Sequence, residues 1–196
     1  MFRFQVAVGD EWVGDLTRDY YLHLGASVDP ANTIPAPLVL DFPGWCVEAE
    51  WQMVNRPWPI LADTEPTPGL IYVTMEGMND VENATYPWNS WNHSSTNGPK
   101  GLTCDPELAS KNRPCYTSCA NLWHGGDCDY PYGSCDWVSC HDDVTFTEMV
   151  IYDIMERYCV NTEQIHVTGM SNGGMFIWSR IMDRLAETVA SAGESI

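Results

Sequence analysis

The stretch QIHVTGMSNGGMFIW, residues 164–178, constrains the fold of this chain more than any other. It joins an apolar, β-branched run to an amphipathic run through Gly169-Met170-Ser171-Asn172-Gly173, a GxSxG pattern. This pattern is typical of a strand that turns sharply into a helix with the serine at the turn. Glycines two residues before and two residues after the serine let the two backbones pass closely. The sequence therefore predicts a strand that ends at Ser171 and a helix that leaves it.

Ser171 could serve either of two purposes in such a turn. Serine caps helices well, so the hydroxyl could simply cap the helix that follows. Alternatively, the turn projects the side chain from the carboxyl edge of the sheet, where a helix N-terminus favours developing negative charge. We favour the second interpretation, in which Ser171 is a nucleophile. The backbone N–H groups of Asn172 and Trp45 would then form the oxyanion hole, unless the DFPGW segment around Trp45 is merely a strand exit.

Apolar periodicity predicts the other elements. Alternation over residues 1–8 indicates a half-buried strand, and residues 17–24 read as a second strand antiparallel to it. The later elements are strands at 37–42, 70–75, 164–169 and from 189, and helices within 46–62, over 141–161 and over 173–188. From residue 37 onward this order implies an α/β fold with a mainly parallel sheet covered on both faces. We expect residues 1–196 to form a single domain.

Residues 79–140 show no helical period and form a cysteine- and aromatic-rich insertion within that domain. Six of the eight cysteines lie between Cys104 and Cys140. An even number at this density indicates disulfides in an oxidising compartment, whereas zinc sites favour CxxC pairs, which are absent here. Zinc remains the alternative, with these candidate ligands: Cys115, Cys119, Cys128, Cys135, Cys140, His124 and His141. The aromatic residues Trp88 and Trp91 could stack on sugar or phenolic rings, or simply pack the insertion.

The formal net charge of −18 excludes nucleic acid and anionic membranes as partners. Sequons at Asn83 and Asn92 favour the secretory route and predict an extracellular glycoprotein, although the start MFRFQVAV is not a signal peptide. No run is long and apolar enough to span a membrane. We expect no cofactor, no metal in the active site and a monomer.

Three segments carry a resemblance to a known family. The first segment is VTGMSNGGMF, preceded by RYCVNTEQI. It resembles the nucleophile elbow, the turn from strand to helix that carries the serine, of the secreted feruloyl esterases and polyhydroxybutyrate depolymerases. RDYYLHL followed by PAPLVLDFPGW, and HDDVTF before the elbow, are similar to further segments of that family. The resemblance implies an α/β-hydrolase fold and a serine carboxylic-ester hydrolase that forms an acyl-enzyme on Ser171. It also implies feruloyl or acetyl esters on cell-wall polysaccharide, or a polyester, as substrate.

The sequence departs from that family in two ways. Pro43 stands where the family usually has histidine. The fold order also requires an acid and then a histidine after the serine. The 25 residues after Ser171 contain Asp183, Glu187 and Glu194 but no histidine.

Without a base, a serine hydroxyl is a poor nucleophile near neutral pH. We expect the chain to be the N-terminal part of a longer enzyme, truncated at its C-terminus and lacking the closing strands of its sheet. Two alternatives remain. The chain could be a non-catalytic relative, a pseudo-esterase or carbohydrate-binding module. An upstream histidine could instead act as the base, and among His23, His93, His124, His141 and His166 the least implausible is His141.

The cysteine pattern yields a direct test. Most of the cysteines between Cys104 and Cys140 should pair with one another, so mass spectrometry after alkylation without reduction should find few free thiols. Alkylation of six or more cysteines, or stoichiometric zinc, would contradict the disulfide prediction.

Overall fold

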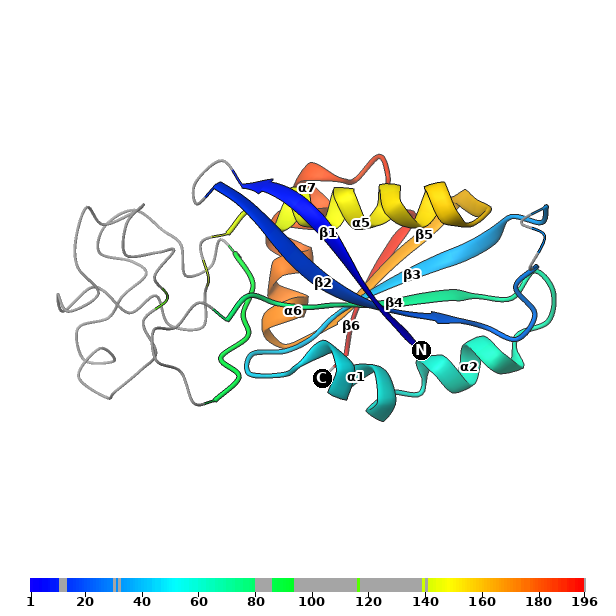
Figure 1. Ribbon diagram of the computed structural model, residues 1–196, viewed down its shortest axis with the longest axis horizontal. Helices are drawn as coiled ribbons and strands as arrows, with labels where there is room; N and C mark the ends of the chain where they lie inside the picture. Colours follow the sequence, from blue (N-terminus) through cyan, green and yellow to red (C-terminus); the bar gives the residue numbers. More distant parts are fainter. Residues whose placement is uncertain are drawn as a thin grey trace, which may run out of the picture.

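A computed structural model describes residues 1–10, 14–29, 31, 33–79, 86–93, 116, 139 and 141–195. In these residues one six-stranded sheet forms the centre, in the order β1-β2-β4-β3-β5-β6 (Figure 1). The strands are β1 Phe2–Asp10, β2 Gly14–Leu24, β3 Ala36–Phe42, β4 Ile71–Met75, β5 Val160–Met170 and β6 Ser191–Ser195. Each strand expected from the sequence is present, although β5 begins several residues earlier than predicted.

The sheet is mixed in direction. β1 pairs antiparallel with β2, and β2 pairs antiparallel with β4. The pairs β3–β4, β3–β5 and β5–β6 are all parallel. Both the antiparallel entry pair and the parallel remainder were predicted from the sequence, so the α/β assignment is confirmed. The carboxyl ends of β3, β4 and β5 consequently meet at one edge of the sheet.

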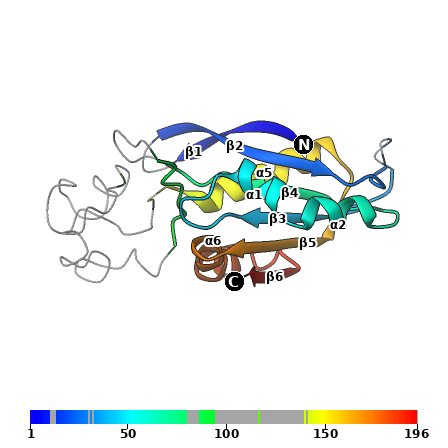
Figure 2. The ribbon, with the colours of Figure 1, turned by 90° about the horizontal axis from the view of Figure 1, so that it is seen from below.

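Helices cover both faces of the sheet (Figure 2). α1 Ala49–Asn55 and α2 Trp58–Thr64 pack on one face, and α5 Asp143–Arg157 packs on the other. After β5 come α6 Asn172–Phe176, a π-helical turn η1 Ile177–Ile181 and α7 Met182–Arg184, on the α5 side. None of the described helices is long and apolar enough to cross a bilayer.

Two of these helical segments differ from the sequence prediction. The single short helix expected within 46–62 is two helices, because α1 ends before Pro57, which is the N-cap of α2. Proline disfavours helical backbone in the residue before it, here Arg56 with φ −97° and ψ 154°. The helix expected to reach residue 188 ends at Arg184, where Leu185 leaves helical geometry.

Side chains of β3 show why the sheet is buried on both faces. Leu38, Leu40 and Phe42 point to the α5 face, into the larger apolar cluster with Phe146 and Phe176. Successive side chains of a strand alternate between faces, and Val39 accordingly joins the smaller cluster on the α1–α2 face. A central parallel strand covered on both sides is expected to be nearly all apolar, as PLVLDF is.

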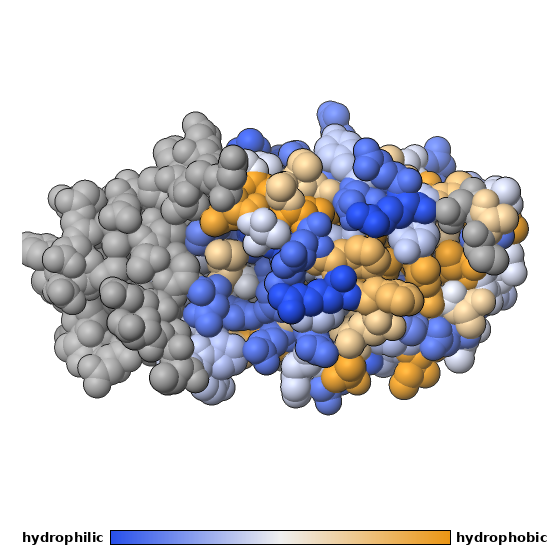
Figure 3. All heavy atoms as spheres, in the orientation of Figure 1, coloured by the Kyte–Doolittle hydropathy of each residue, from blue (hydrophilic) through white to orange (hydrophobic). Residues whose placement is uncertain are grey.

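The outer surface is of mixed polarity. Figure 3, in the orientation of Figure 1, shows hydrophilic residues across the middle of this face, with apolar residues both toward the end away from the grey atoms and in a band beside them. Exposed apolar side chains on the outer faces of α1 and α2 are Trp51, Val54, Ile60 and Leu61.

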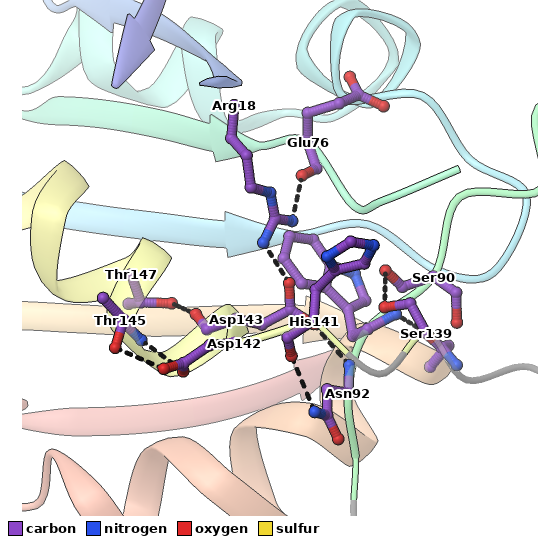
Figure 4. Close-up of polar contacts among 12 residues, drawn as sticks. Arg18, Glu76, Ser90, Asn92, Ser139, His141, Asp142, Asp143, Thr145 and Thr147 are labelled. Atoms are coloured by element: carbon purple, nitrogen blue, oxygen red, sulfur yellow. Dashed lines mark hydrogen bonds and ion pairs between the residues drawn. The ribbon is translucent and has the colours of Figure 1, made fainter. Parts of the chain in front are cut away.

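A buried ion pair ties β2 to α5. The Arg18 guanidinium donates to Asp143, and both side chains are almost wholly removed from solvent (Figure 4). Arg18 also donates to the Glu76 carbonyl oxygen at 2.9 Å and stacks over the Phe146 ring at 3.9 Å. Asp143 additionally accepts the Asn92 N–H at 2.6 Å. A buried charge is stable only when it is paired and hydrogen-bonded in this way.

Removing one member of this pair should be costly. Asp143→Asn would leave the Arg18 charge buried without a counter-charge, and we expect the free energy of unfolding to fall by about 3–5 kcal/mol in urea denaturation. Asp19→Asn is the matched control, because Asp19 pairs with the exposed Arg3 at the surface. Exposed ion pairs contribute less than about 1 kcal/mol, so equal losses in the two variants would contradict this assignment.

Candidate active site

Ser171 lies at the turn between β5 and α6, at the carboxyl edge of the sheet. Its backbone has φ 49° and ψ −112°, a conformation that costs a residue with a side chain roughly 1–3 kcal/mol. Ser171 is exposed. Its side chain makes no capping hydrogen bond to α6, so the alternative that it is a helix cap is not supported.

Close backbone contacts maintain this turn. A Cβ on Gly169 would lie 2.8 Å from the Gly173 carbonyl carbon, and one on Gly173 would lie 2.1 Å from the Phe42 carbonyl oxygen. Any side chain at Gly173 would therefore collide with the end of β3. The two glycines of the pattern have the role that the sequence predicts for them.

The loop of residues 43–48, which follows β3, lies directly beside Ser171. A Cβ on Gly44 would be 3.7 Å from the Ser171 Cβ, so Trp45, the next residue, is held at the same edge. The loop turns tightly, with Cys46 at φ 61° and its N–H donated to the Asn89 carbonyl oxygen at 2.9 Å. The structure thus brings together Ser171, Asn172 and Trp45, as the sequence analysis predicts for a nucleophile and its oxyanion donors.

Trp91 connects this loop to the elbow. Its indole Nε1–H donates to the Pro43 carbonyl oxygen at 2.8 Å, and its backbone N–H donates to the Asn172 side-chain oxygen at 3.1 Å. The ring is fully buried and packs on Phe42 and Phe176. Of the two alternatives for Trp91, packing is therefore supported and stacking on substrate is contradicted, because no face of the ring reaches solvent. Its contacts are those of a residue that positions the site.

Trp88 remains a candidate for substrate contact. It is partly exposed, and its ring lies 5.3 Å from that of Trp45 and 5.2 Å from that of Tyr86. The buried Tyr116 hydroxyl accepts the Trp45 indole N–H at 2.8 Å and donates to the Trp88 carbonyl oxygen at 2.6 Å. An aromatic cluster of Trp45, Tyr86 and Trp88 thus adjoins the loop beside Ser171.

Glu76 was missed by the sequence reasoning. It directly follows β4, at the same edge of the sheet. Its carboxylate accepts the Ala49 N–H at 2.9 Å and an N–H of the Asn89 side chain. Burial raises the pKa of Glu76 to about 7, against the opposing effect of the Ala49 hydrogen bond. The available signal was an acidic residue immediately after a strand that reads as buried.

None of the described histidines is hydrogen-bonded to Ser171. His23 contacts Asp63 at 2.9 Å, and His166 contacts the Ser191 hydroxyl at 2.7 Å. His93 and His141 are buried. His124 lies outside the described residues, as do most of residues 79–140.

A pocket of about 320 Å³ lies between the N-terminus of α5 and the helix that leaves the elbow. His141, Asp143, Phe176 and Arg180 help to line it, whereas Ser171 does not. It is therefore distinct from the elbow, and His141 faces it as part of its wall.

Two further sequence predictions meet the structure only in part. The Asn92 side chain is half-buried and donates to the His141 carbonyl oxygen at 2.8 Å, which argues against a glycan there. Asn83 lies outside the described residues, and so does the predicted pairing of the cysteines between Cys104 and Cys140. Cys46 and Cys159 are free thiols, and burial raises the pKa of Cys46 to about 11. Within the described part of the chain no cluster of metal ligands occurs.

Solved structures of other proteins have a fold similar to that of this chain. The structure is similar to an acetyl xylan esterase from Aspergillus awamori, with a TM-score of 0.54, 14% identity, and coverage of 98% of this chain and 52% of that one. It is also similar to a ferulic acid esterase, with a TM-score of 0.51, 13% identity, and coverage of 97% and 58%. The chain has the α/β-hydrolase fold of these esterases.

A third similar structure is FphF, a fluorophosphonate-binding serine hydrolase from Staphylococcus aureus, with a TM-score of 0.50, 11% identity, and coverage of 97% and 55%. The chain spans about half the length of the solved structures that it matches. No protein-family model and no curated protein matches the sequence. At these identities the likeness establishes the fold alone.

The elbow contacts predict a steep stability difference between two glycine substitutions. Gly173→Ala would force its methyl group into the Phe42 and Pro43 carbonyl oxygens, and should lower the free energy of unfolding by about 3 kcal/mol or more. Gly193→Ala is the control, since a Cβ there meets nothing within 4 Å. Urea denaturation followed by circular dichroism measures both, and equal stability of the two variants would contradict the close packing of the elbow.

Proposed function

We propose that this chain carries the nucleophile and oxyanion half of a secreted serine carboxylic-ester hydrolase. The observation that carries the proposal is the strained backbone of Ser171. This residue is exposed at the end of a central parallel strand, and Gly44 of the 43–48 loop lies against it. Strain of this kind is kept where the surrounding structure enforces it, commonly at active sites. The fold shared with esterases supports the reaction class without fixing the substrate.

The proposed reaction is acyl transfer in two halves. Ser171 Oγ attacks the ester carbonyl carbon as a base takes its proton, and the carbonyl oxygen becomes an oxyanion that accepts hydrogen bonds from the Asn172 and Trp45 N–H groups. Collapse expels the alcohol, which takes the proton back from the base, and leaves an acyl-enzyme on Ser171. Water then attacks the acyl group by the same route and releases the acid.

The base is the part of the proposal that rests on sequence order. None of the described histidines is hydrogen-bonded to Ser171, and none follows it in the sequence. We assign the base and its orienting acid to residues beyond Ile196. Asp183, which is exposed on α7, is not a member of the triad in this assignment.

The substrate class follows from the surroundings of Ser171. The cluster of Trp45, Tyr86 and Trp88 offers aromatic surface beside the oxyanion loop, suited to a phenolic acyl group or to a sugar ring of the alcohol. We therefore propose feruloyl or acetyl esters on polysaccharide, with a polyester as the other candidate.

A binding module is the competing function. Ser171 without a base at hand, next to partly exposed aromatic rings, would also suit a protein that holds carbohydrate without turnover. The burial of Trp91 weakens this alternative, because it removes one of the two rings expected to contact sugar.

Ester hydrolysis tests the proposal. Residues 1–196 should be nearly inactive on p-nitrophenyl acetate and methyl ferulate, because loss of the base costs on the order of 10⁴–10⁶-fold in rate. The same chain extended to its natural stop codon should hydrolyse at least one of these esters, and Ser171→Ala should abolish that activity. Ser27→Ala, near the start of β4 at the opposite end of the sheet, should leave it unchanged.

Two results would overturn the proposal. Strong Ser171-dependent turnover by residues 1–196 alone would contradict the assignment of the base and direct attention to His141. An extended protein that hydrolyses no ester of a broad panel but binds polysaccharide would support the binding module.

A further inference from the structure

Each oxygen of the Glu76 carboxylate has its own donor from a different segment. Oε2 accepts the N–H of Ala49, the first residue of α1, at 2.9 Å. Oε1 accepts an N–H of the Asn89 side chain. In Figure 4 the Glu76 carbonyl oxygen faces Arg18, whereas the carboxylate points away from Arg18. The residue therefore holds three segments with one side chain and one carbonyl group.

These contacts fix the loop of residues 43–48 at two points. Ala49 immediately follows the loop and is bound directly. Cys46, inside the loop, donates its N–H to the Asn89 carbonyl oxygen at 2.9 Å, so it is held through the residue that Glu76 binds. Glu48, the N-cap residue of α1, makes no capping hydrogen bond with its own side chain. Glu76 supplies the acceptor that Glu48 does not.

We propose that Glu76 is a positioning residue, which sets the conformation of the 43–48 loop and hence the place of Trp45 beside Ser171. The proposal rests on the function proposed above, in which the Trp45 N–H stabilises the oxyanion. Its geometric part, the control of the loop by one partly buried carboxylate, can be tested without any turnover.

Protonation of Glu76 should release part of this control. A carboxylate accepts from both donors, whereas a carboxylic acid presents one hydroxyl, whose oxygen is a weaker acceptor and whose proton seeks an acceptor of its own. The charged or titratable groups that face Glu76 are Glu48 from the loop, Asp19, Arg18 and Tyr21 from β2, and Arg3 from β1. Glu48 and Asp19 add to the effect of burial, and Arg18 opposes it.

The way in which stability changes with pH follows from the raised pKa of Glu76. Because the pKa of Glu76 lies at about 7, above its ordinary value of 4.5, the folded chain holds this proton more tightly than the unfolded chain does. The contribution of Glu76 to stability is therefore full below pH 4.5 and is lost as the pH rises through 7. Above pH 7 the ionised carboxylate makes both hydrogen bonds, to Ala49 and to Asn89, and below pH 7 one of them is lost. The loop is therefore held more firmly at high pH, where the contribution of Glu76 to stability is smaller.

Two backbone amides report on this directly. Glu48–Ala49 is the one Glu–Ala pair in the sequence, and Trp45–Cys46 is the one Trp–Cys pair. Labelling with carbonyl-¹³C glutamate and ¹⁵N alanine therefore selects the Ala49 amide, and labelling with carbonyl-¹³C tryptophan and ¹⁵N cysteine selects the Cys46 amide. We expect both amide signals to titrate together with a midpoint near pH 7, and the Ala49 proton to move downfield as Glu76 ionises.

Glu76→Gln should remove both titrations between pH 5 and 9. Glu50→Gln, which removes the exposed carboxylate on the other side of Ala49, is the control and should leave both in place. Titration of Ala49 without Cys46 would mean that Glu76 only caps α1, and would overturn the proposal. Constant signals in the wild type, or unchanged titrations in Glu76→Gln, would overturn it as well. A chain inactive on every ester would contradict the proposed function and leave these signals as they are.

Discussion

The buried pairing of Arg18 with Asp143 is the interaction on which the site depends. Two charges withdrawn from water are stable only when they are paired and hydrogen-bonded, and this pair joins β2, α5, the Glu76 carbonyl group after β4 and the segment of residues 86–93. Asn92 is thereby fixed to the start of α5. Since Trp91 precedes it directly, its indole is set between the end of β3 and the helix leaving the elbow.

Trp91, fixed in this way, holds both the loop of residues 43–48 and the turn at Ser171 in place. The indole N–H of Trp91 holds Pro43, at the start of the loop of residues 43–48, and its backbone N–H holds Asn172, the first residue after Ser171. On the far side of the loop, Asn89 and Glu76 hold Cys46 and Ala49. The strain at Ser171, roughly 1–3 kcal/mol, is thus offset by contacts made elsewhere in the chain.

The sequence predicted the elements and the elbow because both depend on local pattern. Alternation over residues 1–8 and the apolar run 37–42 required only neighbours along the chain, and so did the serine between glycines. The sequence left two roles open for Trp91 because exposure of an aromatic ring is decided by distant residues, here Phe42 and Phe176. Glu76 was missed for the same reason: its donors come from residues 27 and 13 positions away. The break at Pro57, by contrast, was foreseeable from proline chemistry.

In the proposed function, the arrangement separates the two halves of an acyl-transfer site. A nucleophile and an oxyanion loop need fixed backbone, and the described residues of this chain supply contacts that fix both Ser171 and the loop of residues 43–48. A base needs only to reach Ser171 Oγ, and it can be delivered by any loop that ends at the same edge of the sheet. The elbow and its loop are held by a buried ion pair, a buried tryptophan and a partly buried carboxylate, and none of these groups is the base of the proposed reaction. In the proposed function, Ser171 is therefore organised for attack independently of the group that activates it.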